Sequence, residues 1–488
     1  MARSRPSPPG GVRAPLPGFQ RTKIVATIGP ASDDPAVLRG MMDAGLDVVR
    51  VNSSHGTAEL RTRWMRTVRE VAAAAGQHIG LLVDLQGPRI RVGTLAAPRT
   101  LVEGGTVVFA PEAEAAGDEI PTTYEALAQD ARPGARILLD DGLLAVEVTE
   151  VRSPRVVARV RHGGVLRGKK GMNLPDVRVS APAVTAKDRD DIARAVEQGA
   201  DYIGISFVSR PEDVEEVRRL VPGHVRLVAK IERAAALERL ADIVQAADAV
   251  MVARGDLGVE LPYEEVPLAQ KRLIRLAIRQ GRAVITATQM LESMVENPRP
   301  TRAEASDVAN AILDGTDAVM LSAETAIGRY PVEAVAAMAR IIREIERAVV
   351  DEMIPTPQRR RSDPRGPAPS VEDAIAAATT AAADMLRVPA ILCFTKSGFT
   401  ARKIAALRPV APIVGLSTDA RTCRHLSLIW GIVPERAEHV PDYTAMLDVA
   451  RDTLLEKGYA KSGDLIVVTA GVPFEVPGTT NLLKVEVV

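Results

Sequence analysis

Eight short runs of apolar, mostly β-branched residues constrain the fold of this chain more than any other feature. Each run ends in polar or charged residues. The runs span 23–29, 47–52, 79–85, 202–207, 226–231, 249–254, 283–288 and 318–323. Nearly continuous apolar runs of this length are typical of parallel strands buried on both faces of a sheet.

Helix-like stretches separate most of these runs. Apolar residues recur in them at i, i+3 and i+4, as in 34–44, 59–75, 211–220 and 263–280. Eight strands alternating with helices over about 250 residues predict an α/β protein built on a (β/α)8, or TIM, barrel. A doubly wound open sheet is the competing fold, but the count of eight and the position of the polar residues favour the barrel.

The interval between the third and fourth runs is too long for one crossover helix. It contains short strand-like segments at 106–109, 136–139, 144–148 and 156–160, separated by turn signals such as Asp140-Asp141-Gly142. We therefore expect a small β-barrel domain, residues 92–167, inserted into the larger barrel. At the loop side of a barrel, such a domain can act as a lid.

The other predicted boundaries follow from composition. Residues 1–18 are rich in Pro, Arg and Gly and have no apolar segment, which predicts a disordered tail rather than a secretion signal. The predicted parts are this tail, the catalytic barrel (19–91 and 168–354), a Pro/Arg-rich linker (355–370) and a C-terminal α/β domain (371–488) with a long helix from Val371 and strands at 390–394, 413–416 and 465–469.

Charge and cysteine content exclude several classes of protein. Lys+Arg and Asp+Glu both number 62, so the chain is not a generally basic nucleic-acid binder. No apolar run approaches the roughly 20 residues of a membrane helix. The two cysteines, Cys393 and Cys423, cannot form a disulfide framework, so we expect a cytoplasmic protein with no nucleic-acid or membrane partner.

Charged side chains gather where the runs end, which in such a barrel is where the active site forms. Three pairs lie two residues apart and are expected to point together into the mouth: Arg50 with Asn52, Lys230 with Glu232, and Arg254 with Asp256. Burying such charges costs several kcal/mol each unless they pair or bind a metal. Structural ion pairs explain any single pair equally well, but three converging strands favour a functional site.

This set of residues suits phosphate chemistry. Glu232 and Asp256 offer the hard oxygen ligands that Mg²⁺ prefers. Lys230 and Arg50 supply positive charge for a phosphoryl group in transfer. Gly255 allows a ligand to approach the backbone closely.

Longer motifs then identify a family. They include 22–32 (TKIVATIGPAS), 49–56 (VRVNSSHG), 84–93 (DLQGPRIRVG), 251–260 (MVARGDLGVE) and 317–325 (DAVMLSAET). In this order and spacing, the chain from Arg21 to Val488 resembles the pyruvate kinases. The resemblance implies a glycolytic enzyme that transfers a phosphoryl group from phosphoenolpyruvate to ADP, giving pyruvate and ATP, and a homotetramer.

The resemblance also implies roles for single residues. Lys230 resembles the lysine that stabilises the transferring phosphoryl group, with Arg50 and Arg91 as phosphate clamps. Glu232 and Asp256 resemble the ligands of Mg²⁺ or Mn²⁺. The other implied roles are carboxylate binding (Gly255, Asp256, Thr288), enolpyruvate protonation (Thr288, Ser322, Glu324) and nucleotide binding (Pro30, Asn52, His55, Arg91, Lys170 and Asn173), although a capping role is equally consistent with His55.

One part of the family pattern differs here. Asn52, Ser54 and Asp84 match three ligands of the K⁺ site found in many members, but the fourth position is Leu85, which has no side-chain oxygen. Arg89 stands where K⁺-dependent members carry a glutamate. We predict that the Arg89 guanidinium replaces the monovalent cation, so that K⁺ is not required; a degraded K⁺ site beside a surface arginine is the alternative.

The C-terminal domain resembles the regulatory domain of the family. In the segment 394–401 (FTKSGFTA), Thr395, Ser397, Gly398 and Thr400 are positioned to hold the phosphate of an AMP or sugar-phosphate effector at a helix start. Simple helix capping is the alternative reading. Phe399 stands where an arginine is frequent.

Two other functions remain open at this point. A Mg²⁺-dependent lyase or aldolase acting on an enolpyruvate would use Glu232 and Asp256 in a similar way, but it would not need Lys230 or Arg91. A catalytically silent kinase kept as a metabolite sensor would have lost Lys230, Glu232, Asp256 or Thr288, and none of these is lost.

Overall fold

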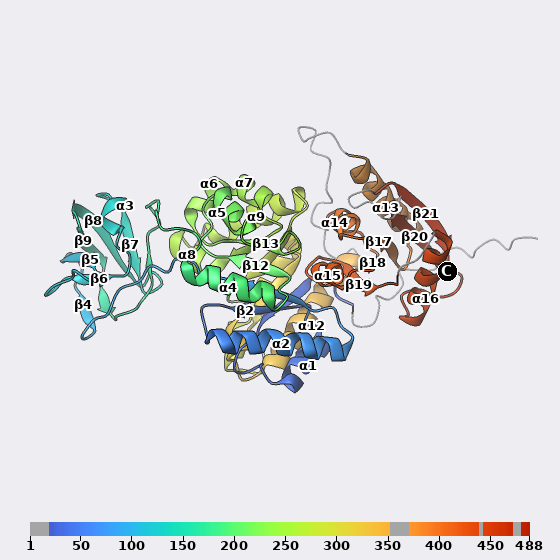
Figure 1. Cartoon of the computed structure of the whole chain (residues 1–488), viewed down its shortest axis with the longest axis horizontal. Coiled ribbons are helices and arrows are strands. Elements are labelled where there is room, and N and C mark those ends of the chain that lie inside the picture. Colours follow the sequence, from blue (N-terminus) through green and yellow to red (C-terminus); the bar gives the residue numbers. More distant parts are fainter. Residues whose placement is uncertain (1–18, 352–369, 439–442, 472–479) are drawn as a thin grey trace, which may run out of the picture.

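The computed structural model describes residues 19–351, 370–438, 443–471 and 480–488. The predicted tail (1–18) and all of the predicted linker except Ser370 lie outside these residues. Three parts follow one another along the long axis of the molecule: the inserted domain, the barrel and the C-terminal domain (Figure 1).

The eight apolar runs form a closed parallel barrel, as predicted. Its strands are β1 (Lys23–Thr27), β2 (Val48–Asn52), β3 (Gly80–Asp84), β12 (Tyr202–Ile205), β13 (Arg226–Ile231), β14 (Ala249–Ala253), β15 (Ala283–Ala287) and β16 (Ala318–Leu321). Each hydrogen-bonds to its neighbours in the order β1-β16-β15-β14-β13-β12-β3-β2. Most strands end one or two residues before the apolar runs do, because the chain turns there into the loops of the barrel mouth.

Helices surround the barrel. They are α1 (Pro35–Ala44), α2 (Ala58–Ala75), α4 (Ala186–Glu197), α5 (Pro211–Arg218), α6 (Ala234–Glu238), α7 (Leu240–Ala246), α8 (Arg254–Glu260), α9 (Val266–Arg279), η1 (Glu292–Val295), α10 (Arg302–Asp314), α11 (Ala323–Ala326) and α12 (Pro331–Val350). Their ends follow the sequence: α10 begins with a Thr301–Glu304 capping box and ends at Gly315, whose φ is 98°.

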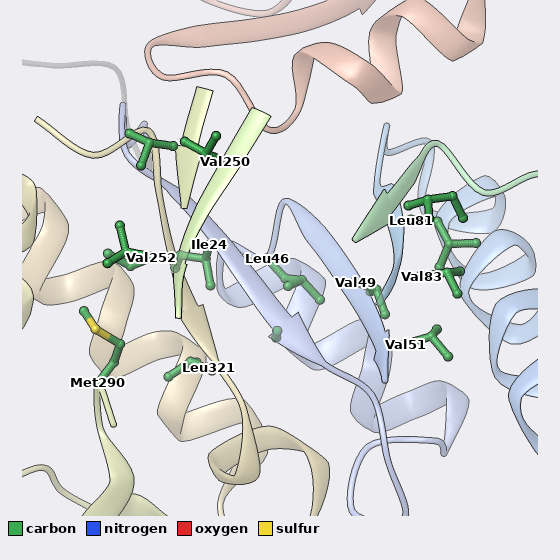
Figure 2. Close-up of a cluster of buried hydrophobic side chains, with 14 of the residues drawn as sticks. Ile24, Leu46, Val49, Val51, Leu81, Val83, Val250, Val252, Met290 and Leu321 are labelled. Atoms are coloured by element: carbon green, nitrogen blue, oxygen red, sulfur yellow. The ribbon is translucent and has the colours of Figure 1, made fainter. Parts of the chain in front are cut away.

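Alternation along the strands divides the apolar residues between two cores. Ile24, Val49 and Val83 face outwards and pack against the helices in the larger core, part of which is drawn in Figure 2. Val25 and Leu82 face inwards, in a cluster that continues into the C-terminal domain. The base of the barrel is therefore closed by the C-terminal domain, and its opposite end carries the loops of the mouth.

The inserted domain is an all-β unit with one short helix. Its elements are β4 (Arg99–Leu101), β5 (Thr106–Pro111), β6 (Ile120–Thr122), α3 (Leu127–Asp130), β7 (Arg136–Leu139), β8 (Leu144–Arg152), β9 (Arg155–His162), β10 (Gly164–Leu166) and β11 (Met172–Asn173). Six strands form one sheet in the order β11-β7-β8-β9-β5-β6. Isolated bridges connect Arg91 to Gly171 and Val92 to Thr122, at the two edges of this sheet.

The C-terminal domain is the expected small α/β unit. It contains α13 (Val371–Leu386), β17 (Ile391–Phe394), α14 (Phe399–Ala405), β18 (Ile413–Ser417), α15 (Ala420–Leu426), β19 (Ile432–Arg436), α16 (Tyr443–Glu456), β20 (Leu465–Ala470) and β21 (Leu482–Val487). Its sheet has the order β19-β18-β17-β20-β21. Both cysteines are buried and unpaired. Among the described residues, no helix has the length and apolar character needed to cross a membrane.

Candidate active site

A network of buried ion pairs lies at the mouth of the barrel, centred on Lys230. The Lys230 Nζ atom is 2.7 Å from Glu232 Oε1 and 3.1 Å from Asp84 Oδ1. It also donates a 2.7 Å hydrogen bond to Ser206 Oγ. Burial alone would lower the pKa of Lys230, but its two carboxylate partners outweigh burial and raise it. The pairing therefore favours the charged form of this buried lysine.

Arg50, at the neighbouring strand end, completes the network. Its Nη2 atom lies 2.6 Å from Asp84 Oδ2, and its Nη1 donates to Thr27 Oγ1 at 3.0 Å. Burial would raise the pKa of Asp84, but Lys230 and Arg50 together hold it below its usual value. Asp84 thus fixes both cations in the mouth, as their convergent positions in the sequence predicted.

Glu232 is held by the backbone of the preceding strand end. Its Oε2 atom accepts a 2.8 Å hydrogen bond from the Phe207 N–H. Phe207 has a φ of 57°, in the left-handed region that a phenylalanine rarely adopts. Lys230 and Glu232 lie on one face, as the two-residue spacing predicted.

The same argument was wrong for Arg254 and Asp256. Strand β14 ends at Ala253, and Arg254 begins the helix α8, so the pleat of a strand no longer sets the two directions. The Arg254 guanidinium pairs with Asp307 at 2.7 Å and donates to the carbonyl of Thr288 at 2.6 Å. Asp256 instead remains exposed at the mouth.

Asp256 is close enough to Glu232 for the two charges to interact. Desolvation within the mouth and then the Glu232 charge raise the pKa of Asp256 to about 6. Two like charges with hard oxygen donors, one of them open to solvent, fit a divalent cation that leaves further positions for water and substrate. The donor set therefore suits Mg²⁺ or Mn²⁺ bound by Glu232 and Asp256.

Thr288 follows β15 in a strained conformation. Its φ is 69°, a left-handed value that is uncommon for a β-branched residue. The hydroxyl accepts a 2.8 Å hydrogen bond from the Gly255 N–H and donates to the Ala287 carbonyl at 2.5 Å. These bonds, with Arg254 on its carbonyl, hold Thr288 beside Gly255.

Ser322 and Glu324 follow β16. The fully buried Glu324 carboxylate accepts hydrogen bonds from the Ser322 N–H at 2.6 Å and the Leu291 N–H at 3.0 Å. The Ser322 hydroxyl is buried and has no hydrogen-bond partner among the described residues. Glu324 therefore fixes the backbone at Ser322 and Leu291, and the Ser322 hydroxyl is free to form a hydrogen bond with a substrate or water.

Arg89 lies within electrostatic range of the central carboxylates. Burial and the nearby Arg91 lower the pKa of the Arg89 guanidinium, and the carboxylates at positions 256, 232 and 84 act in the opposite direction. Leu85 is buried. Of the other predicted monovalent-cation residues, Asn52 accepts a 3.0 Å hydrogen bond from the Ser54 N–H.

The remaining predicted residues lie around this centre or outside it. Pro30 and His55 have exposed surface. Partial burial of the imidazole and then the charges of Arg89, Arg50 and Arg91 lower the pKa of His55. Lys170 pairs with Asp140 at 2.8 Å in the inserted domain. The charge of Asp141 acts on Asp256, so this turn of the inserted domain lies near the mouth. Asn173 lies on β11.

The predicted effector residues lie together in the C-terminal domain, away from the barrel mouth. Gly398, with a φ of 76°, precedes α14. Thr400 is buried, and its hydroxyl is 2.6 Å from that of Thr480, so it is already engaged. Thr395 is buried and Ser397 is partly exposed.

Two features of the site were missed at the sequence level. Ser206 holds Lys230 and donates to the Leu85 carbonyl at 2.7 Å. Its position near the end of the run 202–207 could have predicted this role, because the charged residues Lys230 and Glu232 lie at the end of the next run. The role of Arg254 in fixing Thr288 had no such signal, because it depends on contacts between two loops.

Comparisons with known proteins agree over most of the chain. A family model described as "Pyruvate kinase, barrel domain" matches residues 19–335, and one described as "Pyruvate kinase, alpha/beta domain" matches residues 373–486. A pyruvate kinase of Geobacillus stearothermophilus is 45% identical over 477 residues, covering 96% of this chain and 80% of the relative. One from Methylorubrum extorquens is 42% identical, covering 96% and 98%. A crystal structure of a pyruvate kinase from Cryptosporidium parvum superposes with a TM-score of 0.88 at 32% identity, covering 96% of each chain.

Proposed function

The chain belongs to the pyruvate kinase family, and from this premise we propose how its residues carry out the reaction of that family. The enzyme transfers the phosphoryl group of phosphoenolpyruvate to ADP and releases pyruvate and ATP. The observation that carries the proposal is the Lys230–Asp84–Glu232–Arg50 network in the mouth of the barrel.

Phosphoryl transfer needs positive charge where the phosphoryl oxygens become more negative. Lys230 and Arg50 supply it from fixed positions, since Asp84 and Ser206 already hold them. Glu232 and Asp256 would hold Mg²⁺ or Mn²⁺. When bound, the cation polarises substrate oxygens as a Lewis acid.

The second half of the reaction places a proton on the methylene carbon of enolpyruvate. We assign this role to the Thr288 hydroxyl, with Ser322 as its proton relay and Glu324 as a positioning residue. Two observations support this assignment. The Gly255 N–H holds the Thr288 hydroxyl, and the Ser322 hydroxyl has no hydrogen-bond partner in the part of the chain that the structure describes, while its backbone N–H is held by Glu324. The backbone N–H groups of Gly255 and Asp256 and the hydroxyl of Thr288 bind the substrate carboxylate in this proposal.

The nucleotide binds between the mouth and the inserted domain. Pro30, Asn52, His55, Arg91 and Lys170 line this position in our proposal, and Asp141 near Asp256 supports the approach of the inserted domain to the mouth. Closure of this domain as a lid excludes water, which would otherwise accept the phosphoryl group.

Arg89 replaces the monovalent cation of K⁺-dependent relatives in this proposal. The support is its partial burial and the effect of the Asp256, Glu232 and Asp84 charges on it. Leu85, which has no side-chain oxygen, is buried. A guanidinium charge in this place makes added K⁺ unnecessary. The double variant Leu85→Thr/Arg89→Glu should then acquire strong K⁺ dependence, and an unchanged cation profile would exclude this role for Arg89.

Three further predictions remain proposals. The segment with Thr395, Ser397, Gly398 and Thr400 binds an AMP or sugar-phosphate effector, although Thr400 must first release Thr480. The enzyme assembles as a homotetramer, and it works in the cytoplasm.

The test is pyruvate formation from phosphoenolpyruvate and ADP with Mg²⁺ in K⁺-free buffer, before and after KCl. Full activity before KCl supports both the transfer reaction and the role of Arg89, and activity only after KCl retains the first alone. Lys230→Met should lower kcat by on the order of 10³-fold. The matched control, Lys461→Met in an exposed loop of the C-terminal domain, should leave kcat unchanged. Equal activity of the two variants would contradict the proposed site.

A further inference from the structure

A small cavity lies at the base of the barrel, where the C-terminal domain docks. It is distant from the mouth, because the strand ends that form it are the amino-terminal ones. Its polar and charged lining consists of Arg282 and Asp317 from the barrel and Arg402 and Arg408 from the C-terminal domain. The rest is apolar and includes Ala283 and Ala405.

Positive charge is in excess around this cavity. Arg282, Arg402 and Arg408 line the cavity. Arg218 and Arg226 lie close enough that, after burial, their charges also lower the pKa of Arg282, and Arg226 likewise lowers the pKa of Arg402. Two carboxylates face them. Asp248 is shared by Arg218 and Arg226, and Asp317 pairs with Arg408 at 3.1 Å. Among the residues that line the cavity itself, three arginines face one carboxylate, so positive charge is in excess at this domain interface.

Three of these guanidinium groups each keep one donor without a partner among the described residues. The Nε–H groups of Arg226, Arg282 and Arg408 are buried and donate no hydrogen bond to any residue in the described parts of the chain. Leaving a buried charged donor unpaired costs free energy. A ligand that accepts hydrogen bonds would remove this cost.

Arg402 and Arg282 form no ion pair with any described residue. Arg402 donates one 3.1 Å hydrogen bond to the Ser397 carbonyl, and Arg282 donates one of 2.8 Å to the Gln245 carbonyl. Burial, together with the charges of Arg226 and Arg282, lowers the pKa of Arg402 to about 10. The two positive charges therefore repel each other, and each guanidinium keeps N–H donors that make no hydrogen bond to a described residue.

We propose that this cavity is a binding site for a small oxyanion, inorganic phosphate or the phosphate of a small monoester, held by Arg282, Arg402 and Arg408. Planar guanidinium groups match the oxygens of such an anion. Asp317 also lines the cavity but does not repel the ligand strongly, because it is neutralised by Arg408 and accepts from the Val284 and Trp430 N–H groups.

Such a ligand would join two domains. Arg282 belongs to the barrel, whereas Arg402 and Arg408 belong to the C-terminal domain. Arg402 also holds the carbonyl of Ser397, in the loop before α14. Bound anion therefore stabilises the docked arrangement of the two domains and fixes one end of that loop.

The test is the melting temperature of the full chain against inorganic phosphate, at constant ionic strength in a buffer with no other oxyanion. We expect a saturable rise for the wild type, since a ligand that binds only the folded state stabilises it. Arg282→Gln should raise the half-saturating phosphate concentration by roughly 10-fold or more. The control Arg275→Gln, an exposed arginine on α9, should respond like the wild type.

Further arms locate the site and its ligand. Lys230→Met should keep the phosphate-dependent rise in melting temperature, because the catalytic mouth does not form this site. Loss of the rise in Lys230→Met would overturn the proposal. If Arg282→Gln does not fold, Arg402→Gln replaces it. A response to glycerol 3-phosphate as well as phosphate identifies a monoester site, and a response to phosphate alone identifies the free ion. No saturable response in the wild type, or equal responses in Arg282→Gln and wild type, would refute the site.

Discussion

His425 should make the stability of the protein fall as the pH is lowered below neutral. Its imidazole is buried between the C-terminal domain and the barrel base, with its ring centroid 5.5 Å from that of Tyr202. Burial lowers the pKa of His425 from 6.5 to about 4, against the charge of Asp201 and with the help of nearby arginines.

The sign follows from proton binding in the two states. Between the folded and unfolded pKa values, the unfolded chain binds a proton at this position and the folded chain does not. Acidification below 6.5 therefore favours unfolding, and the effect levels off below the folded value of about 4. At pH 5 the difference amounts to about 2 kcal/mol, from the 1.36 kcal/mol that corresponds to one pKa unit.

The assay is urea denaturation of wild type and His425→Gln in phosphate-free buffer at about pH 7.5 and about pH 5, followed by circular dichroism. Loss of the ring lowers stability equally at both pH values, so only the difference between them reports on titration. The wild type should lose about 2 kcal/mol more than His425→Gln on acidification. The exposed His224→Gln should behave like the wild type. An equal acid loss in wild type and His425→Gln would refute the reasoning.

Three other substitutions test the site and the fold. Arg254→Lys should lower kcat by roughly 10²-fold with a small change in thermal stability, because the Thr288 carbonyl loses its hydrogen bond from the guanidinium. Steady-state kinetics measure kcat and melting curves measure stability. An unchanged kcat would contradict the positioning role of Arg254. Glu324→Gln should cost about 1–3 kcal/mol in stability, since an amide N–H₂ would face a buried backbone donor, and an unchanged melting temperature would exclude that strain. Gly29→Ala should lower the free energy of unfolding by about 1–3 kcal/mol, because the new Cβ would lie 2.5 Å from the Ala326 carbonyl oxygen. The control Gly223→Ala has no atom within 4 Å of the new Cβ and should leave stability unchanged. Equal melting temperatures of the two variants would count against close packing at Gly29.

Local pattern was sufficient for the barrel and for the centre of the site. The apolar runs are consecutive residues, and their period of two already separates Val25 inside from Ile24 outside. Lys230 and Glu232 lie on one strand end, so their common direction is a property of the chain itself. Family motifs added roles to these positions, and the comparisons confirmed the family.

Contacts between distant segments were decided only by the tertiary structure. Helix α8 starts at Arg254, and the Arg254 side chain binds the Thr288 carbonyl. In an unbroken strand, Arg254 and Asp256 would have pointed to the same face. The pairing of Ser206 with Lys230 likewise joins two strands.

The two arginines at the barrel base that form no ion pair with any described residue show the same limit most clearly. Arg282 and Arg402 are ordinary charged residues in sequence, 120 positions apart. Whether a charge is solvated, paired or left without a partner depends on what the folded chain places around it. Sequence alone therefore determined which residues point together along one element, and the packing of two domains decided which charges still need a ligand.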